Sequence, residues 1–458
     1  MKKLFRIALI LVVVLGLLTA IGLGGFSWWI MRNMGPDMWV TQLEKNTNCR
    51  GQIDDAKLSL FTKPARLSFT GVKIAPRDAE VDKPISERAP MPEGAAQIII
   101  PEIILEVKLE DLLNRRLFVE QLRLISPVVQ EAQDSRGKST LEALFKKPRH
   151  DDEAKQISAA GPAPSSPVAP ADEKKKSRSS GDFAFTVSNA SIEGGSLTIQ
   201  NSSTTIRIHD LEFILSGIDI DHTDLANHNG ITARLVTHIQ VEGMARIGGV
   251  KRPAELANMK INGDSVITPI DPATGEWMPY SLLKLTIAQG STLAGHITMG
   301  DAAGKEMKKL LEYGIDLAPV RVGGPLLEPV VLNGAFKNNI FSILADTRFA
   351  FPDYEVVIER KSYVNAAQDI HKMELRLSCG QELQARLQEG VSKAKLGESI
   401  TRGLFKALSD ERGRMTFDIE SEGTLSDPEI KPKLDRILKN LMRGEGLEDL
   451  FKGLLKKL

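Results

Sequence analysis

Apolar and charged residues alternate at every step of the segment Leu105-Glu106-Val107-Lys108-Leu109-Glu110. Successive side chains of a β-strand point to opposite faces, so this alternation predicts a strand with one apolar and one solvated face. The pattern returns after residue 182 and dominates the rest of the chain, in the stretches 183–187, 197–199, 206–208, 211–215 and 218–220. Many short strands at near-regular spacing predict a mainly β protein with an antiparallel sheet.

Turn signals support this interpretation. Glu193-Gly194-Gly195 and Asn201-Ser202 separate neighbouring alternating stretches, and Gly and Asn are typical of tight turns. We expect further strands near the following residues: Leu235, Val241, Ile287, Ile297, Phe349, Val356, Leu375 and Phe417.

Only a few segments have helical spacing. Asp37–Lys45 is expected to form a short helix, with Met38 and Leu43 on its apolar side. Two more short helices are expected around Met307–Leu311 and Leu396–Leu408. From Ile430 to Leu458 the leucines follow the spacing i, i+3, i+4, i+7, which predicts two amphipathic pieces broken near Gly444-Glu445-Gly446.

The N-terminus predicts a membrane anchor. Lys2, Lys3 and Arg6 precede an apolar run from Ile7 to Ile30, and 24 residues of helix span about 36 Å, enough for a hydrocarbon core of about 30 Å. Basic residues before the span keep the N-terminus in the cytoplasm and place the rest of the chain beyond the membrane. A cleaved signal peptide fits less well, because the run is long and no small-residue cleavage site follows closely.

The segment 148–182 predicts a disordered linker, because it is rich in Pro, Ser and Lys and has too few large apolar residues to form a core. The expected organisation is therefore an anchor (1–36), an N-terminal β block (37–147), the linker (148–182), a main β body (183–429) and C-terminal amphipathic helices (430–458).

Composition argues against several function classes. The chain carries 59 basic and 59 acidic residues, which disfavours nucleic acid as a partner, since phosphate binding needs a basic surplus. No nucleophile elbow, zinc-binding helix or phosphate loop is present. Asp219, Asp221, Asp224, His222 and His228 share one stretch that could hold a cation, but a solvated turn between strands is favoured. We expect no enzyme activity, no cofactor and no metal.

The two cysteines, Cys49 and Cys379, leave two alternatives open. They could pair across a long loop in an oxidising compartment, or they could be two unrelated buried thiols, which is the favoured interpretation.

The C-terminal segment also has two interpretations. Residues 430–458 hold eight Lys or Arg against four Asp or Glu. A basic helix with a leucine-rich face can lie on an anionic membrane, or it can pack on the β body as a cap, which is favoured.

The order of these features resembles the AsmA family of bacterial envelope proteins. The anchor and short helix come first, followed by Leu105–Leu113, Arg115–Leu124, Ser126–Val129 and Asp134–Leu141, then a polar insert and a strand pair at 183–199. The ending Glu422–Ile430 is also similar to that family. The resemblance covers residues 1–220 and 415–458, and its motifs are mostly strand patterning, so their order makes the case. Members often continue through many more β-repeats than this chain does.

The resemblance implies a bacterial inner-membrane protein with one span, whose bulk lies in the periplasm. It implies an elongated, curved antiparallel β-sheet forming an apolar groove, which binds or transfers phospholipids between membranes or supports outer-membrane biogenesis. The alternative is a membrane-anchored scaffold or assembly factor that docks other envelope proteins through the C-terminal helices. The candidate groove residues are Leu105, Val107, Leu109, Leu197, Ile199, Ile206, Ile208, Leu211, Phe213 and Leu215.

Overall fold

A computed structural model describes most of the chain and shows a mainly β protein with few helices, as predicted; strands hold 59% of the described residues. The described residues are 35–59, 62–108, 116–132, 139–145, 184–201, 203–220, 224–295, 297–302, 311, 315–365, 367–393, 405, 408–424 and 428–433. The chain divides into two compact units, with the boundary between Glu193 and Gly194. We refer to Leu9–Glu193 as the N-terminal unit and Gly194–Leu458 as the C-terminal unit.

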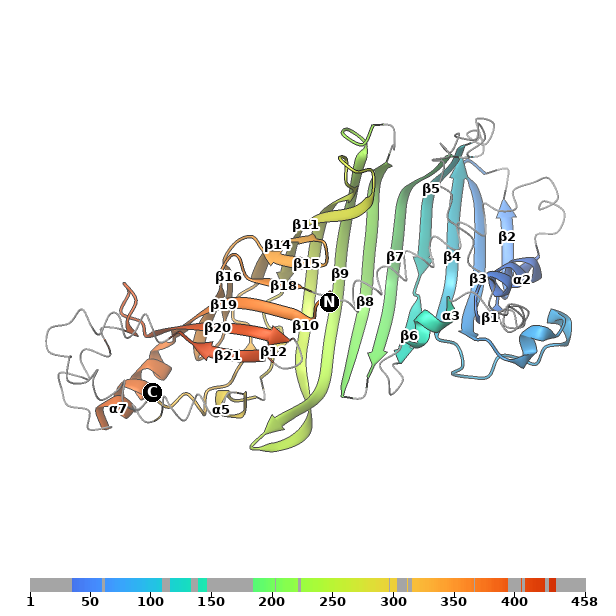
Figure 1. Ribbon diagram of the computed structural model, residues 1–458. Coiled ribbons are helices and arrows are strands. Elements are labelled where there is room, and N and C mark those ends of the chain that lie inside the picture. Colours follow the sequence, from blue (N-terminus) through green and yellow to red (C-terminus); the bar gives the residue numbers. More distant parts are fainter. Residues whose placement is uncertain are drawn as a thin grey trace, which may run out of the picture. The chain divides into compact units, whose positions relative to one another are not determined.

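The N-terminal unit is built around a sheet of short and medium strands (Figure 1). Its elements are α2 (Pro36–Asn46), β1 (Cys49–Gln52), β2 (Asp55–Ser59), β3 (Ala65–Pro76), η2 (Ala79–Asp82), η3 (Ile85–Glu87), β4 (Ile98–Lys108), β5 (Arg116–Ile125), β6 (Val128–Ala132), α3 (Thr140–Leu144) and the first part of β7 (Ala184–Gln200). β1 and β2 pair with β3, β3 with β4, and β4 with β5 and β6, all antiparallel. β5 pairs in parallel with β7, so this sheet is mixed.

Helix α2 confirms the predicted short helix. Pro36 occupies its first turn, where a missing N–H costs nothing, and Trp39, Val40 and Leu43 form its buried side. The Trp39 ring meets the Phe69 ring of β3 edge-on, with centroids 5.2 Å apart. Because Phe69 registers with Ile103 of β4, α2 covers the apolar face of this sheet near β3.

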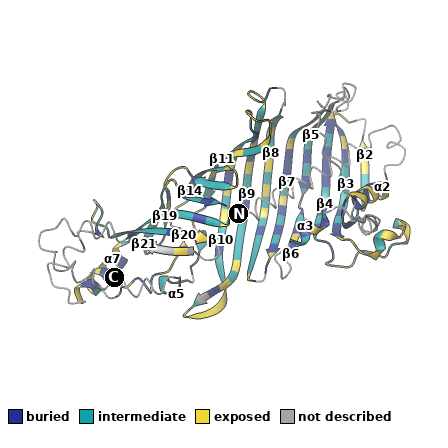
Figure 2. Ribbon diagram, in the orientation of Figure 1, coloured by how far each residue is buried: buried dark blue, intermediate teal, exposed yellow. Residues whose placement is uncertain are grey.

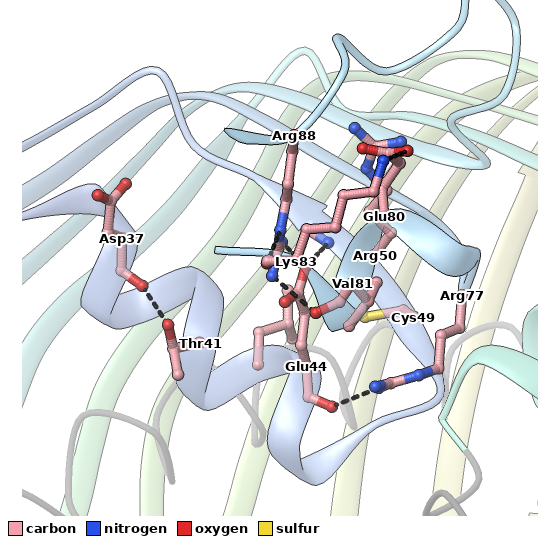
Figure 3. A network of polar contacts seen from close by, with 12 residues as sticks. Asp37, Thr41, Glu44, Cys49, Arg50, Arg77, Glu80, Val81, Lys83 and Arg88 are labelled. Atoms are coloured by element: carbon pink, nitrogen blue, oxygen red, sulfur yellow. Dashed lines mark hydrogen bonds and ion pairs between the residues drawn. The ribbon is translucent and has the colours of Figure 1, made fainter. Parts of the chain in front are cut away.

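A buried polar network holds α2 to the loop that follows β3 (Figure 3). Glu44 is only 4% exposed, and its Oε1 accepts hydrogen bonds from the Gly51 N–H at 3.0 Å and from Arg88 Nη1 at 2.8 Å. Arg88 also donates to the carbonyls of Lys83 and Val81, each at 3.0 Å. The carboxylate and the guanidinium are therefore satisfied by the chain itself, which identifies the network as structural.

The C-terminal unit begins within β7 and is dominated by long antiparallel strands. Its elements are β8 (Thr204–Ile220), β9 (Asn229–Ile247), β10 (Val250–Ile270), β11 (Trp277–Ile287), β12 (Thr292–Leu293), α5 (Met299–Ala302), β13 (Gly324–Pro325), β14 (Val330–Lys337), β15 (Ile340–Ile343), β16 (Thr347–Ala350), β17 (Tyr354–Ile358), β18 (Tyr363–Asn365), β19 (Ile370–Cys379), α7 (Gln381–Lys393), β20 (Thr416–Thr424) and β21 (Pro428–Pro432). The main ladder runs β8–β9–β10–β11–β14–β15–β18–β19–β20–β21. β12 and β13 extend from β10, and β16 and β17 join at β19.

Bulges explain why the alternation in the sequence is interrupted. The segments 206–208, 211–215 and 218–220, expected as separate strands, all belong to β8. Asp210 has φ of 50°, and the register with β9 shifts between His209 and Glu212. The extra residue restores the apolar positions to the same face of the sheet.

Helix α7 packs on one part of the apolar side of the C-terminal sheet. We call this part, which includes Leu377 and Phe417, the distal part. Leu383, Leu387 and Val391 follow helical spacing and are at most 1% exposed. They pack in one cluster with Leu377 and Phe417 of the sheet.

Several expectations change on comparison with the structure. Ile297 is not in a strand but in the connection to α5, where its N–H donates to the Ala294 carbonyl at 3.0 Å. Residues 430–432, expected to begin the C-terminal helices, lie in β21, where they pair with β20 and Pro432 disfavours a continuing helix. The sequence interpretation missed β10, β14 and α7.

Other expectations fall wholly or mainly outside the described residues. These are the anchor at residues 7–30, the linker at 148–182, the helix at 307–311 apart from Leu311, most of the helix at 396–408 and the tail beyond 433. Within the described part of the chain, no helix has the length and apolar character needed to cross a membrane. Both cysteines are buried and free, in agreement with the favoured alternative.

Candidate functional site

The register of the C-terminal unit places one continuous set of side chains on a single face of the sheet. Residues directly opposite each other in an antiparallel pair share a face, so the strand register extends the assignment from β8 to β20. We define the apolar face as the side chains on this face. Its main members are Ile206, Ile208, Phe213, Leu215, Ile231, Ala233, Leu235, Thr237, Ile239, Val241, Ala257, Met259, Ile261, Gly263, Ser265, Ile267, Ser281, Leu283, Leu285, Ile287, Val330, Leu332, Gly334, Phe336, Phe341, Ile343, Val364, His371, Met373, Leu375, Leu377, Cys379, Phe417, Ile419 and Ser421.

Two adjacent rows across five strands show how different the two faces are. The row on the apolar face reads Phe213, Leu235, Gly263, Leu285 and Leu332 from β8 to β14. The next row, one residue along each strand, reads Ile214, Arg234, Asp264, Lys284 and Asn333. Apart from Arg252, which registers with Ala245 at the end of the β9–β10 hairpin, the residues in register on this face include no Asp, Glu, Lys or Arg, so this face has the chemistry of a protein interior.

The opposite face is charged and forms ion pairs across strands. Arg207 Nη1 lies 2.7 Å from Glu242 Oε2, and Lys372 Nζ lies 2.9 Å from Glu420 Oε1. Arg376 Nε lies 3.0 Å from Asp418 Oδ1. These pairs mark the opposite face as the one in contact with water.

The few hydroxyl groups on the apolar face are hydrogen-bonded within the sheet. Ser265 Oγ and Ser281 Oγ are 2.6 Å apart, and Ser265 also donates to the Leu282 carbonyl at 2.9 Å. Thr237 donates to the His209 carbonyl at 3.2 Å. These three side chains therefore place no unpaired donor against an apolar molecule.

Burial divides the apolar face into two parts. Under α7 the side chains are fully buried, as Val330 at 1% and Leu377 at 2% exposure show. Across β8–β11 most large members, such as Leu235, Ile261 and Leu283, are only half-buried (Figure 2). We call the members of the apolar face on β8–β11, from Ile206 to Ile287 and without residues 244–253, the open part.

Glycines let large side chains lie flat on this surface. A Cβ at Gly263 would collide with the Leu285 side chain, and a Cβ at Gly334 would collide with the Phe341 ring. Both glycines therefore give a neighbouring apolar side chain room to cover the strand backbone.

The sequence-predicted groove residues fall in three places. Ile206, Ile208, Phe213 and Leu215 lie on the apolar face, in its open part. Leu211 follows the bulge at Asp210 and has no register partner in β9, although alternation from Glu212 places it on the same side.

The remaining candidates lie on other strands. Leu197 and Ile199 are buried on β7 in the C-terminal unit. Leu105 and Val107 are buried on β4 of the N-terminal unit, and Leu109 is outside the described residues. The candidates within the described residues are therefore divided between the N-terminal and the C-terminal unit, and they do not form a single site.

The sequence analysis expected strands near Leu235, Val241 and Ile287 but chose none of their residues as groove candidates. Ile231, Leu235 and Ile239 occupy every fourth position of β9 and therefore lie on one face, with Arg234 and His238 on the opposite face. The same period of two that identified β8 would have found these residues, because the signal is equally regular there.

Burial suppresses the reactivity of both cysteines. Burial raises the pKa of Cys379 to about 12 and, as the largest of several causes, the pKa of Cys49 to about 11, so both are neutral thiols and weak nucleophiles. The described part of the chain contains no group of His, Cys, Asp or Glu side chains able to hold a metal ion.

Comparison with known proteins leaves the geometry as the main guide. No protein-family model, curated protein or solved structure matches this chain.

Proposed function

We propose that this protein binds phospholipid acyl chains along the open part of the apolar face. In this proposal the predicted span at residues 7–30 anchors the chain in a bacterial inner membrane, and the curved β-groove carries phospholipids between membranes or otherwise supports outer-membrane biogenesis. The observation that carries it is an apolar face that continues through the main ladder but is only half-buried across β8–β11, and whose residues in register include no Asp, Glu or Lys and one Arg, Arg252, at the end of the β9–β10 hairpin.

The physical argument is one of solvation. A sheet with one apolar face is stable only when something covers that face, and α7 covers the distal part. Acyl chains would cover the open part and gain about 0.8 kcal/mol for each methylene group removed from water. Such binding needs no catalytic residue and no cofactor.

The position of the hydroxyl groups supports an apolar ligand. Ser265, Ser281 and Thr237 already have partners in the sheet, so they offer no specific recognition of a polar molecule. The surface therefore favours a ligand recognised by its hydrophobic bulk.

Photocrosslinking from paired positions tests the proposal. A benzophenone amino acid is placed at Phe213, Leu235 or Leu285 in the full chain, and matched variants carry it at Ile214, Arg234 or Lys284, the neighbouring positions on the opposite face. Irradiation in native membranes followed by mass spectrometry should yield phospholipid adducts from the first set and few from the second. Equal labelling of both sets, or no lipid on the apolar set in folded protein, would contradict lipid binding here.

One observation favours the alternative of a membrane-anchored scaffold for envelope proteins. The charged face carries exposed apolar side chains on neighbouring strands: Val266 registers with Leu282, and they are 58% and 43% exposed. Large exposed apolar side chains in register are typical of protein interfaces. Adding benzophenone at Val266 or Leu282 to the crosslinking series distinguishes the two functions. A scaffold would yield protein adducts from these two positions and no lipid adduct from Leu235.

A further inference from the structure

The hairpin that joins β9 to β10 ends in a segment with unusual composition. Residues 243–254 read Gly-Met-Ala-Arg-Ile-Gly-Gly-Val-Lys-Arg-Pro-Ala, with three basic residues and no acidic residue. We call residues 244–253 the hairpin tip. The two strands pair with each other through Val250 and Ile247, and Gly248 and Gly249 make the turn with positive φ angles of 59° and 80°.

The hairpin tip extends beyond its neighbours in the sheet. Register between β8 and β9 stops at Gly243, and register between β10 and β12 covers only Ala257 and Asn258. Figure 1 shows the end of this hairpin reaching past the adjacent strands of the unit, and Figure 2 shows it largely exposed. The exposed side chains of the hairpin tip are therefore placed where they can contact a surface.

The exposed side chains of the hairpin tip are both apolar and basic. Met244 is 50% exposed and Val250 is 54% exposed. Lys251 and Arg252 are exposed, and neither forms an ion pair with a described residue. Exposed apolar side chains beside unpaired cations are the combination that binds the headgroup region of an anionic bilayer.

The turn itself is held by one carboxylate. The Gly249 N–H donates to Asp301 Oδ1 at 3.2 Å, and Thr298 Oγ1 donates to Asp301 Oδ2 at 2.7 Å. These hydrogen bonds, with the Thr298 bond the largest contribution, lower the pKa of Asp301, so it is ionised at neutral pH. Lys251 and Arg252 outnumber this single charge, and the local balance remains basic.

We propose that the hairpin tip docks on an anionic bilayer surface, with Val250 and Met244 entering the headgroup region and Lys251 and Arg252 contacting lipid phosphates. A membrane fits better than a protein partner because the tip is narrow, being one two-stranded turn, and offers cations without a shaped surface around them. This inference is independent of acyl-chain binding on the open part, since the two use different residues.

A fluorophore at the tip gives a direct readout. The full chain is reconstituted in phosphatidylcholine nanodiscs, with an environment-sensitive fluorophore on Val250→Cys. Vesicles of phosphatidylcholine with phosphatidylglycerol are then added. The emission should shift to the blue and strengthen, whereas pure phosphatidylcholine vesicles should produce little change. The same label on Val266→Cys, farther along β10, should not respond.

Charge removal tests the mechanism. Each basic residue near an anionic surface contributes about fivefold in affinity, so Lys251→Gln with Arg252→Gln should weaken vesicle binding by about 25-fold. Lys260→Gln with Lys284→Gln, two exposed lysines of the charged face, is the matched control and should leave binding nearly unchanged.

The outcomes that would overturn the proposal are specific. If a folded K251Q/R252Q protein binds anionic vesicles as well as the parent, or if Val266→Cys responds as strongly as Val250→Cys, then the hairpin tip is not the docking element. Circular dichroism of each variant verifies folding, which these exposed changes should not disturb.

Discussion

Two parts of the same apolar face in the C-terminal unit differ in what covers them. The distal part, with Leu377 and Phe417, packs under α7 and is fully buried. The open part, with Leu235 and Leu283, lies on the same face of the same ladder but is half-buried. The difference shows that alternation makes a face apolar, and that only a covering element makes it a closed core.

The N-terminal unit shows the same effect of a covering helix. Its strand β4 includes the alternating residues Leu105–Lys108, and Ile100 and Ile103 of this strand are at most 2% exposed. There, α2 lies against the apolar face and Trp39 contacts Phe69. An apolar face that has a dedicated helix is buried, whereas the open part is only half-buried.

The largest effect should come from removing the cover of the distal part. Leu383→Ala with Leu387→Ala in α7 should cost about 3 kcal/mol of unfolding free energy at each site, because both side chains are buried and leave cavities. Leu235→Ala with Leu283→Ala in the open part should cost about 1 kcal/mol at each site. Urea unfolding measures both pairs, and equal losses would show that the open part is packed as tightly as the distal part.

The next effect concerns the ion pair that holds α2 in place. Glu44→Gln should destabilise the N-terminal unit by about 3 kcal/mol, because it leaves Arg88, whose side chain is 11% exposed, without its charged partner. Glu389→Gln, in the exposed Glu389–Lys393 pair of α7, is the control and should leave the thermal midpoint nearly unchanged, because exposed ion pairs contribute little. Thermal unfolding of both variants checks this; a small loss for Glu44→Gln would mean that water reaches the pair.

Thiol chemistry should separate the two parts of the apolar face directly. At pH 8 a cysteine introduced by Leu283→Cys should react with iodoacetamide more than about 100-fold faster than Cys379, because burial raises the pKa of Cys379 to about 12. Added phospholipid should slow the reaction at Leu283→Cys and leave Cys379 unchanged. Mass spectrometry of the alkylated protein measures both rates. A Leu283→Cys thiol as inert as Cys379 would refute an accessible open part.

The smallest effect is an acid dependence within the N-terminal unit. The hydrogen bonds from Arg123, opposed by burial and aided by Ser191, lower the pKa of Glu193 below its usual value of 4.5. Ionised Glu193 therefore stabilises the β5–β7 pairing above pH 4.5, and this contribution is lost as the pH falls through the lowered pKa. Thermal midpoints between pH 6 and 3 should fall less steeply in Glu193→Gln than in the parent protein; parallel curves would show that the pair contributes nothing.

Part of this structure was predictable and part was not. The mainly β character, α2 and the apolar side of β8 followed from local periodicity, because side-chain direction repeats every two or 3.6 residues whatever the rest of the chain does. The bulge at Asp210 was not recognised, since one inserted residue looks like a turn between two strands. Helix α7 was missed because its apolar positions, Leu383, Leu387 and Val391, are separated by polar and charged residues.

The candidate site followed the same division. Four of the residues chosen from sequence, Ile206, Ile208, Phe213 and Leu215, lie together on the open part. Leu105 and Val107 have equally clear alternation but belong to the buried face of the other unit. Periodicity could not separate the two groups, because it contains no information about which distant element packs on each strand.

The apolar and the polar face of each strand follow from the amino-acid sequence alone, since a strand's geometry is local. Which apolar faces lie in register, which of them a helix covers and which stay half-buried depend on the tertiary structure. Covering depends on residues far away along the chain, such as Leu387 over Leu377, and no short segment encodes that encounter.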